Sequence, residues 1–503
     1  METNRYKLQE NVSSIAFFSI VAFVFSTLSP LHLWTNSFCS GDSSVFKTVS
    51  MMMKMGYMPY KDSFDHKGPM LYLLNYLGDC IAPYRGIWVI EFCFLTAAFF
   101  MIYKTARLFV KEKTSIIVTF ISISLLFDYY QAGNYTEEYA MTFIAISLFI
   151  FIDYFKNSNI NRCRLIICGA SFAGTLLLRP NMISLWIVMC FAVLIKTIKD
   201  RFWKNFYYLF LFFIIGTIGV LAPIIIWLSM NGALKQFWLD YIVFNMKYSS
   251  TDSVTFLMHS RWSSFFFFFN STIYMAAFFL QIYHCKKEKN IFNYAYLVYM
   301  IMTLVFICLS GAQYVHYGMI LIPIVSYPLA YMISRIENSE CIELRDIVLV
   351  MMGVFVISNN ILPDWVDLVQ NLPTIYNERD EEHIPQVMLD ICDEVDRLGV
   401  DAYDKISVYG NWNEMYILLG RPHATRYSYQ FPIGQIDSRI MDEYFMELYD
   451  EMPKVIIVEN THYDERMENF VKSNAYHFVW GENETVEAGG ALVFSRNSLD
   501  NKK

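Results

Sequence analysis

The stretch KDSFDHKGP, residues 61–69, concentrates ionisable side chains in an otherwise apolar chain. Asp65, His66 and Lys67 are consecutive, and Asp42 lies upstream of them. Carboxylates and imidazoles can exchange protons, and a lysine ammonium is a compact charge that can hold an anion. The apolar segment MLYLLNYLG follows directly, so the cluster is expected at a boundary between water and lipid. Such a cluster suits a substrate that is half lipid and half polar, or it only solvates a loop; the residues alone leave both open.

Two further groups lie downstream. Glu137 and Glu138 are adjacent in QAGNYTEEYAM (131–141), and Arg179 lies in LLLRPNM (176–182). Acidic residues also favour helix N-termini, so the glutamates could serve only a helix end. An arginine close to a bilayer is costly unless it is paired. A phosphate or one of the two glutamates would supply its partner, and a lipid headgroup is the alternative.

Composition indicates a membrane protein. Of the 503 residues, 55% are hydrophobic and 17% charged, and the mean hydropathy is +0.33. The net charge of −8 gives no basic surface for nucleic acid. The ten cysteines form no CxxC pair and no metal-ligand spacing occurs, so we predict no disulfide framework, no metal and no cofactor. Trp34 and Phe38 follow the first apolar segment in place of a small-residue cleavage site, which predicts a retained span.

Apolar runs of suitable length predict about eleven transmembrane helices. The candidates are 12–33, 86–103, 115–128, 139–155, 165–178, 182–195, 206–229, 263–283, 291–309, 317–333 and 347–362. With the N-terminus inside, the inner segments hold 18 Lys and Arg residues and the outer ones nine. This bias follows the positive-inside rule. An odd number of spans then places the C-terminal region outside.

Two external regions follow from this topology. In the loop 34–85, Asp42 and Ser43 are suited to cap a helix, and Phe46, Val49, Met53 and Tyr57 recur at helical spacing. These residues predict an amphipathic helix on the membrane surface, and a second helix should start at Pro69.

The second external region is the tail 363–503, which has no apolar run long enough to span a membrane. It predicts an α/β domain with strands at 405–410, 454–460 and 489–496 and a helix at 413–420. Its stretch 409–430 is rich in aromatics and arginine, which suits either glycan contact or the edge of a domain core. The domains are therefore a transmembrane domain, 1–362, and an extracytoplasmic domain, 363–503.

The motifs resemble the C-type (GT-C) glycosyltransferase superfamily. A long first external loop with an acidic residue just after the first span is similar to that superfamily. The segments PYKDSFDHKGPMLYLLNYLG, QAGNYTEEYAM and LLLRPNM look like its bacterial subgroup, which is similar to protein O-mannosyltransferases and the lipid A aminoarabinose transferase. The motif likeness covers about the first 200 residues; beyond residue 205 only the architecture is similar.

The resemblance implies an inverting transferase in the bacterial plasma membrane. It would move a sugar from a polyprenyl-phosphate donor to a glycan, lipid or protein acceptor on the outer face, among membrane lipids. Asp42 matches the family's acidic residue and would be the general base. Lys67 would hold the lipid phosphate, with His66 and Asp65 beside it. Glu137 and Glu138 would bind sugar hydroxyls or orient the acceptor, and Arg179 would bind phosphate or pair with them. Some members of the superfamily use a divalent metal and others do not.

Two other functions compete with this one. A transporter or flippase of lipid-linked sugars would also place charges along a membrane path. However, the cluster lies in a loop rather than within a span, and no inverted repeat is evident. A non-catalytic scaffold with an external domain would leave the DHKGP cluster unexplained. Later external segments add Tyr241, Lys247, His259, Arg261 and His316 as further cavity candidates.

Overall fold

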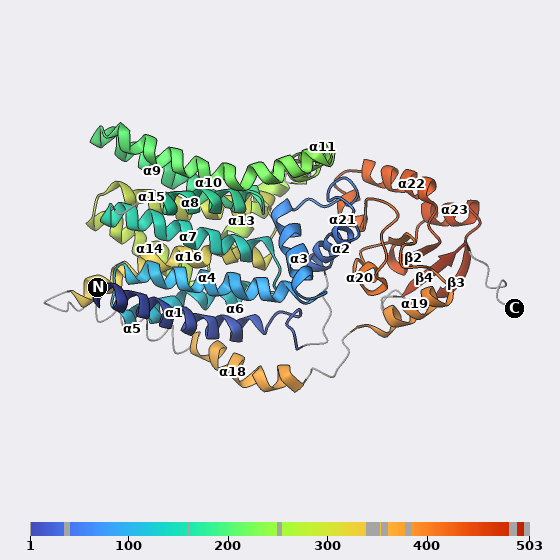
Figure 1. Ribbon diagram of the computed structural model, residues 1–503, viewed down its shortest axis with the longest axis horizontal. Coiled ribbons are helices and arrows are strands. Elements are labelled where there is room, and N and C mark those ends of the chain that lie inside the picture. The colour runs from blue at the N-terminus through green and yellow to red at the C-terminus, as the bar shows by residue number, and fades with distance from the viewer. Residues whose placement is uncertain are drawn as a thin grey trace. The chain divides into compact units, whose positions relative to one another are not determined.

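The computed structural model describes residues 2–34, 41–158, 161–248, 254–338, 353, 361–377, 384–481 and 490–496. The chain forms two compact units, each described by itself below. The helical unit comprises residues 1–34, 88–225 and 252–379, and the mixed unit comprises residues 35–87, 226–251 and 380–503. Figure 1 colours both units along the chain.

The helical unit is built from apolar helices (Figure 1). Helix α7 packs against α8 and against the 3-10 segment η4, while α9 packs against α15. The elements are α1 (Glu2–Ser26), α4 (Ile87–Arg107), α5 (Glu112–Ile123), α6 (Leu125–Tyr129), α7 (Thr136–Asn157), α8 (Arg162–Leu176), η1 (Pro180–Met182), α9 (Ser184–Asp200), α10 (Trp203–Met230, whose end belongs to the mixed unit), α13 (Val254–Phe269), α14 (Thr272–Lys287), α15 (Ile291–Ile307), η3 (Cys308–Ser310), η4 (Val315–Leu321), α16 (Ile322–Glu337) and α18 (Leu362–Asn377).

Within the described residues, five helices are long and apolar enough to cross a membrane, or six if one bent pair counts as a span. That pair, α13 and α14, corrects the prediction of one continuous span at 263–283. The chain bends by 87° at the break between them. Ser271 there has an extended backbone, with φ −56° and ψ 120°, which ends the helical hydrogen bonding. The candidate 347–362 lies almost wholly outside the described residues, so the count of eleven stays a prediction.

The mixed unit combines short helices with a four-stranded sheet. Strand β1 runs parallel to β2, and β4 pairs antiparallel with both β2 and β3, giving the order β1-β2-β4-β3. The elements are α2 (Asp42–Lys54), α3 (Pro69–Ile81), α11 (Leu234–Phe237), the π-helix η2 (Trp238–Val243), α12 (Phe244–Tyr248), α19 (Gln386–Arg397), β1 (Ile406–Tyr409), α20 (Glu414–Leu419), α21 (Phe431–Gly434), α22 (Arg439–Glu451), β2 (Val455–Glu459), η7 (Asn460–His462), α23 (Glu465–Ser473), β3 (His477–Gly481) and β4 (Ala491–Ser495).

One hydrophobic core cluster of the mixed unit lies against one face of this sheet. Ile406 and Val408 of β1, Ile457 of β2 and Val493 of β4 are fully buried together with residues of α19 and α20. Alternate positions of a strand point to the same face, which is why Ile406 and Val408 share this core. The three predicted strands and the predicted helix at 413–420 are confirmed. Strand β3 was missed.

The two helices predicted in the first loop are present, with one correction. Helix α3 starts at Pro69 as predicted. Helix α2 starts at Asp42 with Gly41 as its N-cap, so Asp42 lies in the first turn and is not the cap. The helix ends at Lys54, which leaves Tyr57 outside it.

This loop groups with the C-terminal residues rather than with the apolar helices. The compact units therefore divide the chain differently from the sequence boundary at 362/363. That residues 1–362 form the membrane-embedded part stays a prediction.

Candidate functional site

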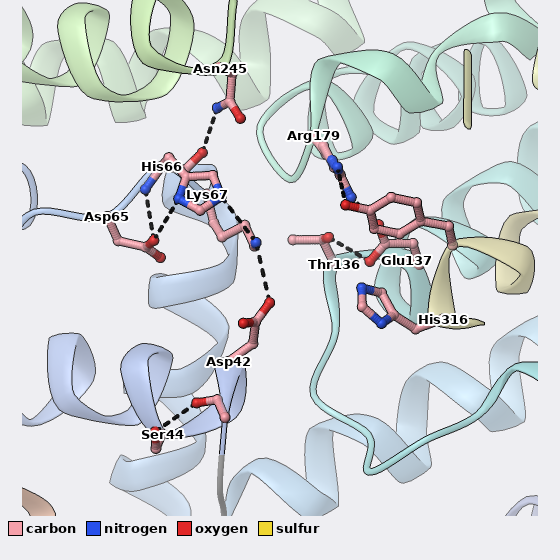
Figure 2. Close-up of polar contacts among 12 residues, drawn as sticks. Asp42, Ser44, Asp65, His66, Lys67, Thr136, Glu137, Arg179, Asn245 and His316 are labelled. Carbon is pink, nitrogen blue, oxygen red and sulfur yellow. Dashed lines mark hydrogen bonds and ion pairs between the residues drawn. The ribbon is translucent and has the colours of Figure 1, made fainter. Parts of the chain in front are cut away.

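Asp42 and Lys67 form an ion pair in the mixed unit (Figure 2). The Nζ atom of Lys67 lies 3.3 Å from Oδ2 of Asp42, across 25 positions of sequence. Half of the Asp42 side chain is exposed, whereas Lys67 is largely covered. The same Nζ lies 3.3 Å from Nε2 of His66 and 5.9 Å from the ring centroid of Phe46. A solvent-accessible carboxylate therefore lies beside a fixed positive charge.

Asp65 is the buried centre that shapes the loop around Lys67. Its carboxylate accepts hydrogen bonds from the Tyr72 hydroxyl at 2.8 Å, the Tyr429 hydroxyl at 2.9 Å and the backbone N–H of His66 at 2.7 Å. Burial raises the pKa of Asp65, but the hydrogen bonds and the charges of His66 and Lys67 outweigh it and lower that pKa to about 2. Asp65 is thus an ionised anchor that holds its neighbours in place.

His66 lies between this anchor and the lysine. Its Nδ1 is 3.3 Å from Asp65, and its ring packs on Phe244 and stacks on Tyr248. Burial, followed by the charge of Lys67, lowers the pKa of His66. The Asn245 side chain donates to the His66 carbonyl at 2.7 Å, which fixes the backbone from a segment far along the chain (Figure 2).

The stretch 409–430 holds the 61–69 loop. The Ser63 hydroxyl and His423 Nε2 are 3.0 Å apart, the Phe64 N–H donates to the Arg426 carbonyl at 2.6 Å, and Tyr429 binds Asp65. Its composition favoured either glycan contact or a core edge, and these contacts show that it positions the loop. The sequence signal was the aromatic and arginine content; the pairing across more than 360 positions had no signal.

Helices α2 and α3 are joined by a second, buried charge pair. Lys47 of α2 binds Asp79 of α3, and Asp79 also accepts from the Ser50 hydroxyl at 2.5 Å. Both members of the pair are almost fully buried. Removing one partner of a buried ion pair is strongly destabilising, so this contact holds α2 and α3 in a fixed arrangement. Asp42 lies in the first turn of α2, and Lys67 lies just before the start of α3.

In the helical unit, Arg179 pairs with Glu137, one of the partners that the sequence predicted. Arg179 Nη1 lies 2.6 Å from Oε1 of Glu137, and Nη2 donates to the Tyr317 hydroxyl at 2.7 Å (Figure 2). The guanidinium carbon lies 4.1 Å from the Tyr317 ring centroid. Thr136 donates to the other oxygen of Glu137 at 2.8 Å. This is a buried network at the N-terminus of α7.

Glu138 takes a different environment from Glu137. Its Oε2 accepts from the backbone N–H of Asn134 at 2.9 Å, and the side chain is fully buried. The two adjacent glutamates thus have different partners, and their binding of sugar or acceptor stays a prediction. Among the later candidates, His316 stacks on Tyr135 at 4.1 Å and its Nδ1 lies 2.9 Å from Gln131.

The structure therefore assembles Asp42, Asp65, His66 and Lys67 within one unit, and Glu137 with Arg179 within the other. Sequence reasoning missed Tyr72, Tyr429 and Asn245, which orient the first group. Among the residues that the structure describes, no group of three or more His, Cys, Asp or Glu side chains is placed to hold a metal ion.

The fold is shared with a known membrane transferase. Two crystal structures of ArnT, the lipid A aminoarabinose transferase, from Cupriavidus metallidurans are similar to this chain at 10% identity. The structure bound to undecaprenyl phosphate gives a TM-score of 0.57 over 97% of this chain and 99% of that one. The apo structure gives 0.58 over 97% and 98%. The chain therefore shares the fold of ArnT, and its described part holds five helices that are long and apolar enough to cross a membrane.

Sequence comparison identifies the family of the chain. No curated protein matches the chain. Residues 2–345 match the sequence model of a family described as "Putative competence-induced protein Ccs4 N-terminal domain". That match spans more than half of the chain, and the chain therefore belongs to this Ccs4 family.

Proposed function

We propose that the chain is an inverting glycosyltransferase of the bacterial plasma membrane. It transfers a sugar from a polyprenyl-phosphate-linked donor to a glycan, lipid or protein acceptor on the outer membrane face. In the topology that we propose with it, the chain has eleven spans, an internal N-terminus and an external C-terminal region. The shared fold supports the donor class, since one similar structure is of ArnT bound to undecaprenyl phosphate.

The observation that carries the proposal is the Asp42–Lys67 pair, at 3.3 Å. Transfer with inversion needs a group that accepts a proton and a cation that stabilises the leaving phosphate. A half-exposed carboxylate beside a covered ammonium supplies both within one loop.

The reaction is a single displacement. The acceptor hydroxyl gives its proton to Asp42 while its oxygen bonds to the anomeric carbon of the sugar. The bond between that carbon and the phosphate oxygen breaks, and its electron pair leaves with the polyprenyl phosphate. Lys67 stabilises the negative charge that grows on the phosphate, which is most valuable in a site shielded from water.

The remaining candidates divide into two roles. Asp65 is saturated by Tyr72, Tyr429 and His66, so it positions the loop while His66 supports Lys67 at the phosphate. Glu137 and Arg179 bind substrate as a pair, through groups that their mutual contact already orients. Glu138 accepts a hydrogen bond from the backbone N–H of Asn134 and thereby holds the segment that precedes Glu137.

The proposal is tested with Lys67→Gln in the full-length protein. Release of free polyprenyl phosphate is followed with several polyprenyl-phosphate sugars and a mixed acceptor extract. Loss of a charge-assisted contact to phosphate costs about 1.5–3 kcal/mol, so kcat/KM should fall by about 10- to 100-fold. Turnover with the variant equal to that of wild type would contradict the role of Lys67.

Lys61→Gln is the matched control, because it removes the same charge from an exposed lysine in the same loop. It should leave turnover unchanged. If wild type turns over no donor but moves the lipid-linked sugar across vesicles, the chain is a flippase and the proposal is wrong.

A further inference from the structure

A cavity in the helical unit lies between the ends of several helices, away from the Glu137–Arg179 network. It has a volume of about 620 Å³. Its wall is formed by the C-terminal ends of α7, α9 and α16 and by the connection from α14 to α15. Four lysines line it, namely Lys156, Lys196, Lys199 and Lys289.

The two carboxylates in this wall are already neutralised by other groups. Asp200 pairs with Lys196 at 2.9 Å. Glu288 lies 3.8 Å from Arg335 and accepts a hydrogen bond from the Tyr331 hydroxyl. These contacts leave little negative charge to balance the other lysines of the cavity.

The remaining three lysines have no carboxylate within ion-pair distance in the part of the chain that the structure describes. Lys156 donates to the Leu108 carbonyl, and its Nζ lies 4.0 Å from the ring centroid of Phe109. Lys199 and Lys289 are exposed at the rim. The cavity therefore carries a surplus of positive charge that an anion can balance.

The rest of the wall is aromatic. Phe155 and Phe292 pack with ring centroids 5.1 Å apart, and Tyr327 and Tyr331 continue this surface. Aromatic rings with one polar end are favoured where lipid meets water. The combination of lysines and rings suits a ligand with a charged head and an apolar body.

The length of α7 places the cavity at a membrane surface. Glu137 is the second residue of this helix and Lys156 the last but one. The 1.5 Å rise per residue separates them by about 29 Å. The hydrocarbon core of a bilayer is about 30 Å thick. With Glu137 at one membrane surface, the lysine cavity lies at the other.

We propose that this cavity binds the phosphate headgroup of an anionic phospholipid. Lys199 and Lys289 hold the phosphodiester as point charges, and Lys156 does so from the cavity wall. The aromatic wall contacts the glycerol and the start of the acyl chains. Basic cavities between transmembrane helices bind anionic headgroups on the inner side of membranes in the same way. This site is independent of the proposed transfer reaction.

The test measures lipid binding to the full-length protein in detergent. Phosphatidylglycerol, phosphatidylcholine and inorganic phosphate are added separately, and retained lipid is counted by native mass spectrometry alongside the shift in Tm. Phosphatidylglycerol should be retained and raise Tm, and phosphatidylcholine should not. The double variant Lys199→Gln/Lys289→Gln should weaken phosphatidylglycerol binding by about thirtyfold, since each of the two lysines near a headgroup contributes about 1 kcal/mol.

Lys111→Gln/Lys113→Gln is the control, because it removes two exposed lysines that do not line the cavity. Equal loss of phosphatidylglycerol in both double variants would overturn the proposal, since any surface charge would then suffice. A Tm shift of the same size with inorganic phosphate would assign the cavity to a soluble anion. Equal retention of phosphatidylglycerol and phosphatidylcholine would also overturn it, because the cavity would then not distinguish an anionic from a zwitterionic headgroup.

Discussion

Asp65 makes the stability of the folded protein depend on pH. The pKa of Asp65 is about 2 in the folded protein, below the value of about 3.9 for a free aspartate. Its ionised form therefore stabilises the fold above pH 4, and this contribution is lost as the pH falls toward 2. The shift corresponds to about 2–3 kcal/mol. Asp65→Asn should destabilise the protein at pH 6 and progressively less toward pH 3, as followed by tryptophan fluorescence during thermal unfolding.

Tyr429→Phe distinguishes the effect of one hydrogen bond to Asp65 from the effect of the Asp65 charge. It removes one hydrogen bond to Asp65 and leaves the carboxylate, so its cost should be about 1.5–3 kcal/mol at pH 6. A difference between wild type and Asp65→Asn that stays constant from pH 6 to pH 3 would contradict the low pKa.

At the residue scale, the candidate reactive residues could be predicted from the sequence, but the contacts that orient them could not. The cluster Asp65-His66-Lys67 is local, so its composition alone marked it. The hydroxyl of Tyr429 reaches Asp65 from 364 positions away, and nothing in either stretch encodes that pairing. The pairing of Arg179 with Glu137 was predictable because a cation near lipid needs a partner.

At the scale of elements, helices α8 and α10 touch through glycines. A Cβ atom on Gly216 would lie 2.0 Å from the Ile166 carbonyl oxygen, and one on Gly169 would lie 1.9 Å from that of Phe213. Small residues allow such close approach of membrane helices. Gly216→Ala should therefore lower Tm, with a cost of about 1–3 kcal/mol for overpacking.

Gly219→Ala serves as the control for that variant. It lies in the same helix, and a Cβ there meets nothing within 4 Å. Alanine also has the higher helix propensity, so this change should be neutral or stabilising. If both alanines lower Tm equally, the contact between α8 and α10 does not explain the effect.

The predicted elements succeeded where a pattern is long and uniform. Proline at a first turn marked the start of α3, and buried apolar runs marked β1, β2 and β4. The pattern failed at 263–283, since apolar residues on both sides of Asn270 and Ser271 hid the 87° bend. It also missed β3, a strand of only five residues whose side chains are partly covered or exposed.

At the scale of the whole molecule, the charge bias predicts which parts lie outside the membrane. Tyr403 is 90% exposed in the mixed unit, and Lys113 is exposed near the start of α5. An epitope inserted beside Tyr403 should be reached by antibody in intact spheroplasts, because the bias of 18 inner against nine outer positive residues predicts an external C-terminal region. An epitope beside Lys113 should be reached only after permeabilisation. The opposite pattern would invert the topology and place the Asp42–Lys67 pair on the inner face.

The most direct test of the central claim is turnover by Asp42→Asn. The full-length protein in detergent receives polyprenyl-phosphate sugars and an acceptor extract, and the release of polyprenyl phosphate is measured. The amide keeps the shape of the carboxylate but cannot accept the proton, so kcat should fall by about 10²- to 10⁴-fold with donor binding retained. Equal turnover by wild type and Asp42→Asn would contradict the account, because the carboxylate beside Lys67 would then have no part in the reaction.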